Sequence, residues 1–159
     1  LLAVAALDFA ADPATRLRAA ALWYPPVDFP TMDADQAASG IAPAMGSHAA
    51  PDSPESKLLG FTVGAHPEAA SAAGPLAVLA ALPEETPLPA FLLVHGREDP
   101  IIARGQTGRL FDALLARRGI GPLEYLLLPE AGHGTGRFED PGTVARTVAF
   151  LKQALEAEA

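Results

Sequence analysis

Two side chains able to act together as an acid and a base follow apolar segments of this sequence. Asp99 comes shortly after Phe91-Leu92-Leu93-Val94, and His133 stands between two glycines after the segment Leu123–Leu128. If these segments form neighbouring parallel strands, both side chains lie at carboxyl ends, where open α/β sheets bind ligands. We therefore expect Asp99 and His133 to face each other as an acid–base pair that serves a nucleophile.

Each member of the pair also has a purely structural interpretation. An Asp before a Pro often forms an Asx turn or begins a helix, and a lone histidine in a loop can simply be held by hydrogen bonds. Glu98 competes with Asp99 for the acid role, but it stands one residue earlier, where a side chain in the turn should point elsewhere. The order of Asp99 and His133 and the residues that flank them favour the catalytic interpretation.

The other histidines are expected to have other roles. His95 belongs to the central apolar segment and should pack or hydrogen-bond beneath the site. His48 and His66 lie in a region rich in Pro, Ala, Gly and Ser and should be exposed to solvent. No two histidines have metal-ligand spacing with an acid, so the sequence predicts no zinc site and no cofactor.

Three apolar segments predict the strands that would position the pair. The segment from Phe91 has no polar alternation, which is typical of a strand buried on both faces in a parallel sheet. Strands are also expected at Ala19–Tyr24 and at Leu123–Leu128. The aromatic residues at and after the end of the first strand either line a pocket for an aromatic group or pack in the core; they are Trp23, Tyr24 and Phe29.

Helices are expected between and beyond the strands. One should run from about Gly105 to Arg118, with Gly119 as its C-cap, and a closing helix from Pro141 to about Ala157, with Asp140 as its N-cap. Four apolar residues at helical spacing mark the closing helix: Val144, Val148, Leu151 and Leu155. A further helix is expected from Leu1 to about Ala11. The alternation of strand and helix predicts an α/β fold with a mostly parallel sheet flanked by helices.

The long region 27–88 should hold short helices, because a structureless loop of that length is uncommon inside a compact domain. Ser53, Pro54 and Gly60 are typical of the N-cap, first turn and stop of one such helix, and His66-Pro67 begins another. An insertion between two core strands at the active end of a sheet is a suitable place for a lid or substrate-binding cap. We therefore describe the chain as one domain, residues 1–159, with a lid-like insertion over about 27–88.

Composition excludes several classes of partner. The 159 residues suit one globular domain, and the net charge of −8 leaves no basic surface for nucleic acid. The chain has no cysteine, so disulfides and thiolate chemistry are excluded. The apolar start Leu1–Leu7 is too short to span a bilayer, lacks the basic region of a signal peptide and has no initiating Met. These features suggest a fragment, and they leave the compartment and the oligomeric state open.

Four segments together resemble the C-terminal part of α/β-hydrolases, in the nucleophile–acid–histidine order of that superfamily. They are Trp23-Tyr24-Pro25-Pro26-Val27-Asp28-Phe29, Asp52–Gly60, Leu93-Val94-His95-Gly96 with Asp99-Pro100, and Ala131-Gly132-His133-Gly134. The first two are similar to the bacterial acetyl-esterase and feruloyl-esterase-like group, often called BD-FAE and related to hormone-sensitive lipase; prolyl oligopeptidases and dienelactone hydrolases share the last two. The resemblance implies a serine hydrolase of small carboxylic esters with Asp99 and His133 in its triad.

The same resemblance implies two motifs that this sequence does not contain. α/β-hydrolases of this group carry a His-Gly-Gly-type oxyanion loop and a Gly-x-Ser-x-Gly nucleophile elbow. None of the five serines here, at positions 39, 47, 53, 56 and 71, has glycines two residues away on both sides. By the resemblance, the helix expected over Leu1 to about Ala11 follows the nucleophile directly, so the serine and the oxyanion donors are expected upstream.

Two alternatives from other classes stay open. The chain suits a hydrolase fold that has lost its nucleophile and serves as a scaffold or binding module, because fold does not determine function. Retention of Asp99 and His133 argues against that interpretation. A flavodoxin-like nucleotide-binding domain also fits the strand–helix alternation, but no Gly-rich phosphate loop follows a strand here.

Overall fold

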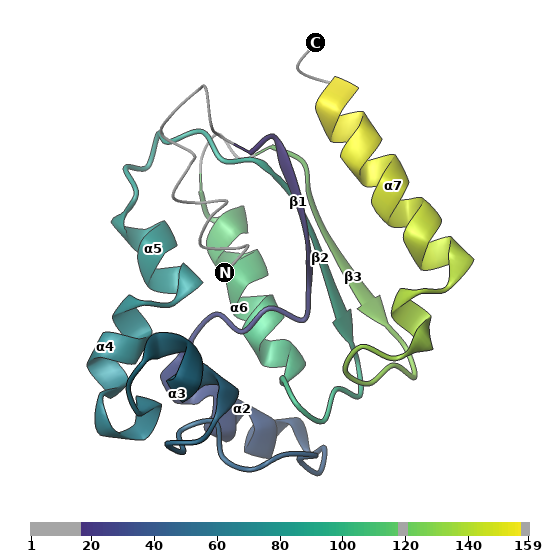
Figure 1. The fold of residues 1–159 in the computed structure, drawn as a ribbon. Coiled ribbons are helices and arrows are strands. Elements are labelled where there is room, and N and C mark those ends of the chain that lie inside the picture. The colour runs from purple at the N-terminus through teal and green to yellow at the C-terminus, as the bar shows by residue number, and fades with distance from the viewer. Residues whose placement is uncertain (1–16, 118–120, 157–159) are drawn as a thin grey trace.

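A parallel three-stranded sheet forms the centre of the protein. The computed structural model describes residues 17–117 and 121–156, so the helix expected over residues 1–11 lies outside the described residues. The strands β1 (Ala19–Trp23), β2 (Ala90–Gly96) and β3 (Leu123–Leu128) stand in that order across the sheet. All three expected strands are therefore present, and their carboxyl ends point the same way (Figure 1).

Helices cover both faces of this sheet (Figure 1). On one face, α5 (Pro75–Ala81) and α6 (Arg104–Leu115) pack against the strands; the buried residues there include Leu22, Leu79, Phe91, Leu93, Leu110 and Leu114. On the other face lies α7 (Pro141–Glu156); this side includes Leu92, Val94, Leu128, Phe138, Phe150 and Ala154. Because β2 contributes side chains to both layers, all seven of its residues are buried, as its apolar sequence predicts.

The region between β1 and β2 holds short helices, as expected. They are α2 (Met32–Ser39), α3 (Pro54–Leu59), α4 (Pro67–Ala72) and α5. The predicted caps of α3 are present: the Ser53 hydroxyl accepts a hydrogen bond from the Ser56 N–H, and Gly60 ends the helix with a φ of 78°. A third apolar cluster joins this region to the loop after β2 through Ile102.

The predicted C-terminal end of α6 is wrong. The helix ends at Leu115, with Ala116 as its C-cap, and the expected cap Gly119 lies outside the described residues. Arg117 does not remain in the last turn, because its guanidinium donates hydrogen bonds to the backbone carbonyls of Leu79, Leu82 and Pro83 at the end of α5. A cation at a helix C-terminus is favourable, so these hydrogen bonds stabilise the end of α5.

The buried face of α7 differs in part from the expected one, since of the four expected residues only Leu151 packs against the core. Val144, Val148 and Leu155 are 43 to 46% exposed, whereas Thr143, Phe150 and Ala154 are buried. Both sets have helical spacing, and the larger side chain of Phe150 buries more apolar surface than any valine of the other set. No helix in the described parts of the chain has the length and apolar character needed to cross a membrane.

Candidate active site

The loops that follow β2 and β3 lie directly against each other. The N–H of Arg97 donates to the carbonyl of Leu128 at 2.9 Å, and the N–H of Glu98 donates to the carbonyl of Ala131 at 2.9 Å. A Cβ atom at Gly96 would lie only 2.4 Å from the Ala131 carbonyl oxygen. The loop with the histidine therefore rests on the end of β2 because residue 96 has no side chain.

This contact brings the two predicted site residues together. The Nδ1 atom of His133 lies 2.9 Å from Oδ2 of Asp99. The Asp99 side chain is fully buried, while that of His133 keeps 27% of its surface exposed. A carboxylate only accepts hydrogen bonds, so Nδ1 carries the proton and Nε2 keeps its lone pair. The geometry thus prepares Nε2 of His133 to accept a proton.

The second oxygen of Asp99 holds the backbone of its own loop. Its Oδ1 accepts hydrogen bonds from the N–H groups of Ile101 at 2.8 Å and Ile102 at 2.9 Å. Burial alone would raise the pKa of Asp99, but the hydrogen bonds from His133 and the two backbone amides outweigh it and lower the pKa. The carboxylate therefore both forms the turn and orients the histidine.

His95 lies beneath the pair, as expected, and is fully buried. Its Nε2–H donates to the carbonyl of Ile102 at 2.8 Å, and its Nδ1 lies 2.6 Å from the hydroxyl of Thr107, which then acts as the donor. Burial lowers the pKa of His95, so the ring is neutral. The Nε2 atom also lies 3.5 Å from Oδ2 of Asp99, so His95 packs directly beneath that carboxylate.

The remaining candidates separate into exposed and buried residues. His66 is exposed, as expected, and Glu98 is exposed while Asp99 is the carboxylate that contacts His133. The expectation for His48 is wrong, because this residue is only 3% exposed. Its Nδ1 lies 3.1 Å from Oε2 of Glu55 and its Nε2 lies 2.9 Å from the carbonyl of Ile101. The interaction with the Glu55 carboxylate outweighs burial and raises the pKa of His48. The sequence missed this role because the partners come from separate segments.

The aromatic residues near the end of β1 have different positions. Phe29 is buried in the third apolar cluster, whereas Trp23 is 37% exposed and packs against Phe138 with ring centroids 5.3 Å apart. The ring of Tyr24 lies against His133, with centroids 4.0 Å apart. Of the three, Tyr24 therefore touches the candidate site.

The family model for the prolyl oligopeptidase family matches residues 59–158, a segment that contains both Asp99 and His133. The chain belongs to the prolyl oligopeptidase family. This match confirms the superfamily expected from the sequence, and the solved structures that resemble the chain confirm the expected α/β-hydrolase fold. No curated protein sequence matches the chain.

Similar structures include both esterases and peptidases. A truncated carbohydrate esterase from gut microbiota matches with a TM-score of 0.68 and 18% identity over 88% of this chain. A prolyl endopeptidase matches with a TM-score of 0.70 and 14% identity over 97%, and a puromycin-hydrolysing peptidase of Mycobacterium tuberculosis with 0.59 and 24% over 94%. The chain spans 43% of the esterase and 20% of each peptidase, and the likeness shows the fold alone.

In this prolyl oligopeptidase family member, four of the five serine hydroxyls make hydrogen bonds to nearby backbone groups or to Asp33. Ser53 Oγ and Ser56 Oγ accept backbone hydrogen bonds in and after α3, at 3.0 Å each. Ser39 Oγ donates to the carbonyl of Gln36, and Ser47 Oγ donates to Asp33. Ser71 is exposed on α4. None of the hydrogen bonds found among the described residues joins a serine to His133.

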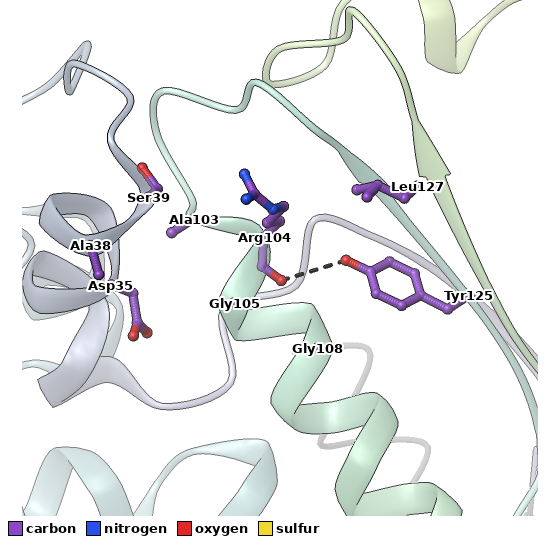
Figure 2. A pocket seen from close by; sticks show the side chains of 9 residues that line it. All are labelled: Asp35, Ala38, Ser39, Ala103, Arg104, Gly105, Gly108, Tyr125 and Leu127. Carbon is purple, nitrogen blue, oxygen red and sulfur yellow. Dashed lines mark hydrogen bonds between the residues drawn. The ribbon is translucent and has the colours of Figure 1, made fainter.

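A cavity of about 400 Å³ lies between α2, the start of α6 and β3 (Figure 2). Arg104 extends into its middle, and the hydroxyl of Tyr125 donates to the backbone carbonyl of Arg104 at 3.5 Å across one wall. Burial raises the pKa of Tyr125. Neither Asp99 nor His133 lines this cavity, so the cavity is separate from the acid–base pair.

Proposed function

We propose that the protein is a serine hydrolase of carboxylic esters, similar to acetyl and feruloyl esterases, in which His133 is the general base and Asp99 orients it. The observation that carries the proposal is the 2.9 Å contact between Nδ1 of His133 and Oδ2 of the buried Asp99, which leaves Nε2 available. The nucleophilic serine is proposed to come from a part of the protein outside these 159 residues, since no serine here stands in a nucleophile elbow.

The proposed reaction has two symmetrical halves. Nε2 of His133 accepts the proton of the serine hydroxyl as its oxygen attacks the ester carbonyl, whose π electrons move to the oxygen. When the tetrahedral intermediate collapses, the bond to the alcohol breaks, and Nε2 returns the proton to the leaving oxygen. Water then attacks the acyl-enzyme by the same proton route and releases the acid. Throughout, Asp99 keeps the proton on Nδ1 and stabilises the imidazolium.

A prolyl-oligopeptidase-type serine peptidase is the second candidate, because the family match favours it. That match covers residues 59–158. The preference for esters rests on the resemblance of Trp23–Phe29 and Asp52–Gly60 to esterases, and these segments lie almost entirely before the matched range. Both candidates use the same acid–base pair, and they differ in the leaving group.

Two measurements on the full-length protein test these proposals. An ester such as p-nitrophenyl acetate should be hydrolysed in preference to peptide p-nitroanilides, with the reverse preference supporting the peptidase. His133→Ala should lower kcat by roughly 10⁶-fold, because the general base is lost. Asp99→Asn should lower it by about 10⁴-fold, because Asn would stabilise the wrong tautomer. His66→Ala is the matched control, since His66 is an exposed histidine, and it should leave kcat unchanged. Ligand binding without turnover would instead support the scaffold interpretation.

The position of the nucleophile can be tested independently. A fluorophosphonate probe reacts with activated serines, and mass spectrometry of the labelled full-length protein identifies the residue. The labelled serine should belong to a Gly-x-Ser-x-Gly sequence encoded upstream of Leu1. A label on any of the five serines of this chain would overturn the proposed arrangement.

A further inference from the structure

Tyr24 lies against the histidine of the candidate site in a way that neither the family match nor the triad explains. We propose that Tyr24 is a positioning residue for His133, with its ring packed on the imidazole so that the base keeps the orientation set by Asp99. This inference rests on the proposed function, because it assigns Tyr24 to the same proton-transfer site. The supporting contacts come from three separate segments of the chain.

The backbone of Tyr24 is held in an uncommon conformation at the end of β1. Its φ is 40°, in the left-handed region that bulky residues rarely adopt. Its N–H donates to the carbonyl of Val94 on β2 at 2.8 Å, which continues the ladder between the two strands by one residue. Strained residues persist where their surroundings determine them, and they concentrate at functional sites.

The ring of Tyr24 is fixed from two further sides. Phe138, which is buried, meets it edge to face with centroids 5.0 Å apart and an interplanar angle of 80°. Gly134, directly after the histidine, has a φ of 59°, and a Cβ there would lie 3.4 Å from the Tyr24 hydroxyl oxygen. The tyrosine therefore has little freedom to swing away from His133.

The consequence for His133 follows from the geometry of the two rings. The centroids are 4.0 Å apart and the planes make an angle of 45°, so the tyrosine ring packs on the imidazole while Asp99 accepts a hydrogen bond from its Nδ1. An aromatic face also attracts a cation, so the contact favours the imidazolium that forms when Nε2 accepts a proton. This role needs the ring and not the hydroxyl.

Nuclear magnetic resonance of the full-length protein tests the contact without any assay of hydrolysis. In the wild type, the Tyr24 ring protons should show an Overhauser effect to the His133 Cε1 proton, and their shifts should follow its titration. Tyr24→Phe should keep the titration midpoint of His133, whereas Tyr24→Leu should move it to lower pH, because the aromatic face that favours the imidazolium is lost. Asp99 and His95, the titratable groups found to interact with His133 among the described residues, are unchanged in both variants.

Trp23→Leu is the matched control, because Trp23 packs on Phe138 but makes no ring contact with His133 among those found. It should leave the midpoint unchanged. In the hydrolysis assay, Tyr24→Leu should lower kcat about tenfold with little change in KM, and Tyr24→Phe should restore kcat. A missing Overhauser effect in the wild type, or equal midpoints in the leucine and phenylalanine variants, would overturn the proposal.

The two proposals fail in distinguishable ways. If the full-length protein does not hydrolyse esters or peptides, the proposed function fails, while the Overhauser effect and the co-titration still decide whether Tyr24 positions His133. If the leucine variant does not fold, the wild-type co-titration decides alone, because a tyrosine that does not sense the charge of His133 cannot stabilise it.

Discussion

Asp99 shows how one side chain satisfies two interpretations that its sequence leaves open. Its Oδ1 atom accepts hydrogen bonds from two backbone amides and forms the turn expected of an Asp before a Pro, while Oδ2 accepts a hydrogen bond from Nδ1 of His133. Three donors to one buried carboxylate keep it ionised, because each donor favours the charged form. The structural role therefore supports the orienting role, since the turn fixes the direction of Oδ2.

The lowered pKa of Asp99 predicts a loss of stability in acid. A carboxyl whose pKa is lower in the folded state stabilises that state fully above its unfolded pKa, and this contribution disappears as the pH falls through the folded pKa. Asp99→Asn should therefore lower the free energy of unfolding by about 1–3 kcal/mol at pH 7. Urea unfolding of the wild type and the variant should show this difference in free energy becoming smaller as the pH falls below 3.8, the ordinary pKa of Asp. A difference that is constant down to pH 3 would contradict the prediction.

At the scale of elements, the end of β2 decides whether the site forms. A Cβ atom added at Gly96 would lie 2.4 Å from the carbonyl oxygen of Ala131 and 2.6 Å from that of Gly132. Both are backbone atoms, so no side-chain rotation could relieve the clash. Gly96→Ala should therefore displace the loop that carries His133 and lower the free energy of unfolding by about 1–3 kcal/mol. Because the displaced loop carries the general base, the kcat of the full-length protein should fall by a larger factor than this loss of stability alone would cause. Thermal unfolding and kcat measured on the same preparations check the two effects.

Gly108→Ala is the matched control for that substitution. Gly108 lies inside α6, and a Cβ there would meet nothing within 4 Å. Alanine is a better helix former than glycine, so this variant should be more stable by up to about 1 kcal/mol and keep its activity. Equal behaviour of the two alanine variants would show that the close contact at Gly96 does not matter.

The buried pair of His48 and Glu55 connects the region between β1 and β2 to the loop of Asp99. His48 reaches the Ile101 carbonyl, and the Ala44 N–H donates to the Pro100 carbonyl at 2.8 Å. Because the pKa of His48 is raised, its contribution to stability is complete below its ordinary value of 6.5 and is lost as the pH rises through the raised pKa.

The expected result is a pH-dependent effect of His48→Gln. The variant should lose about 1–3 kcal/mol of unfolding free energy at pH 6 relative to the wild type, and the loss should become smaller toward pH 9. Urea unfolding at several pH values measures it. His66→Gln, an exposed histidine on the same region, should show no such dependence. An effect of His48→Gln that grows with pH would contradict the sign of the argument.

The sequence correctly predicted the ends of those elements that are determined by residues nearby in the sequence. The bounds of β3 and the caps Ser53 and Gly60 agree with the sequence, because apolar runs, hydroxyl caps and glycine stops act within a few residues. The end of α6 and the burial of His48 depend on contacts with distant segments, such as Arg117 with the carbonyls of α5 and His48 with Ile101, 53 residues apart. Periodicity alone does not contain such contacts.

At the scale of the whole molecule, the layers place the region between the first two strands near the candidate site. In Figure 1, α2 and α3 lie beyond the carboxyl ends of the strands, and the hydrogen bonds of residues 44 and 48 attach this region to the loop of Asp99. This position of α2 and α3 suits the lid or substrate-binding cap that we propose within residues 27–88, whereas α5, in the same range, packs against the sheet as part of the core. Within the described residues, β1 and β3 are the two outer strands of the sheet, and neither has a strand partner on its outer side.

Residues 1–159 produced as an isolated polypeptide should aggregate or remain partly molten. Within the described residues, β1 pairs only with β2, so the other edge of β1 presents unpaired backbone groups beside Trp23, and unpaired apolar edges promote association. Light scattering after size exclusion and a near-ultraviolet thermal melt measure both properties. Trp23→Lys should reduce the association by adding charge at this edge, whereas Val148→Glu, on the exposed face of α7, should not. A monomer with a sharp cooperative melt would contradict the prediction.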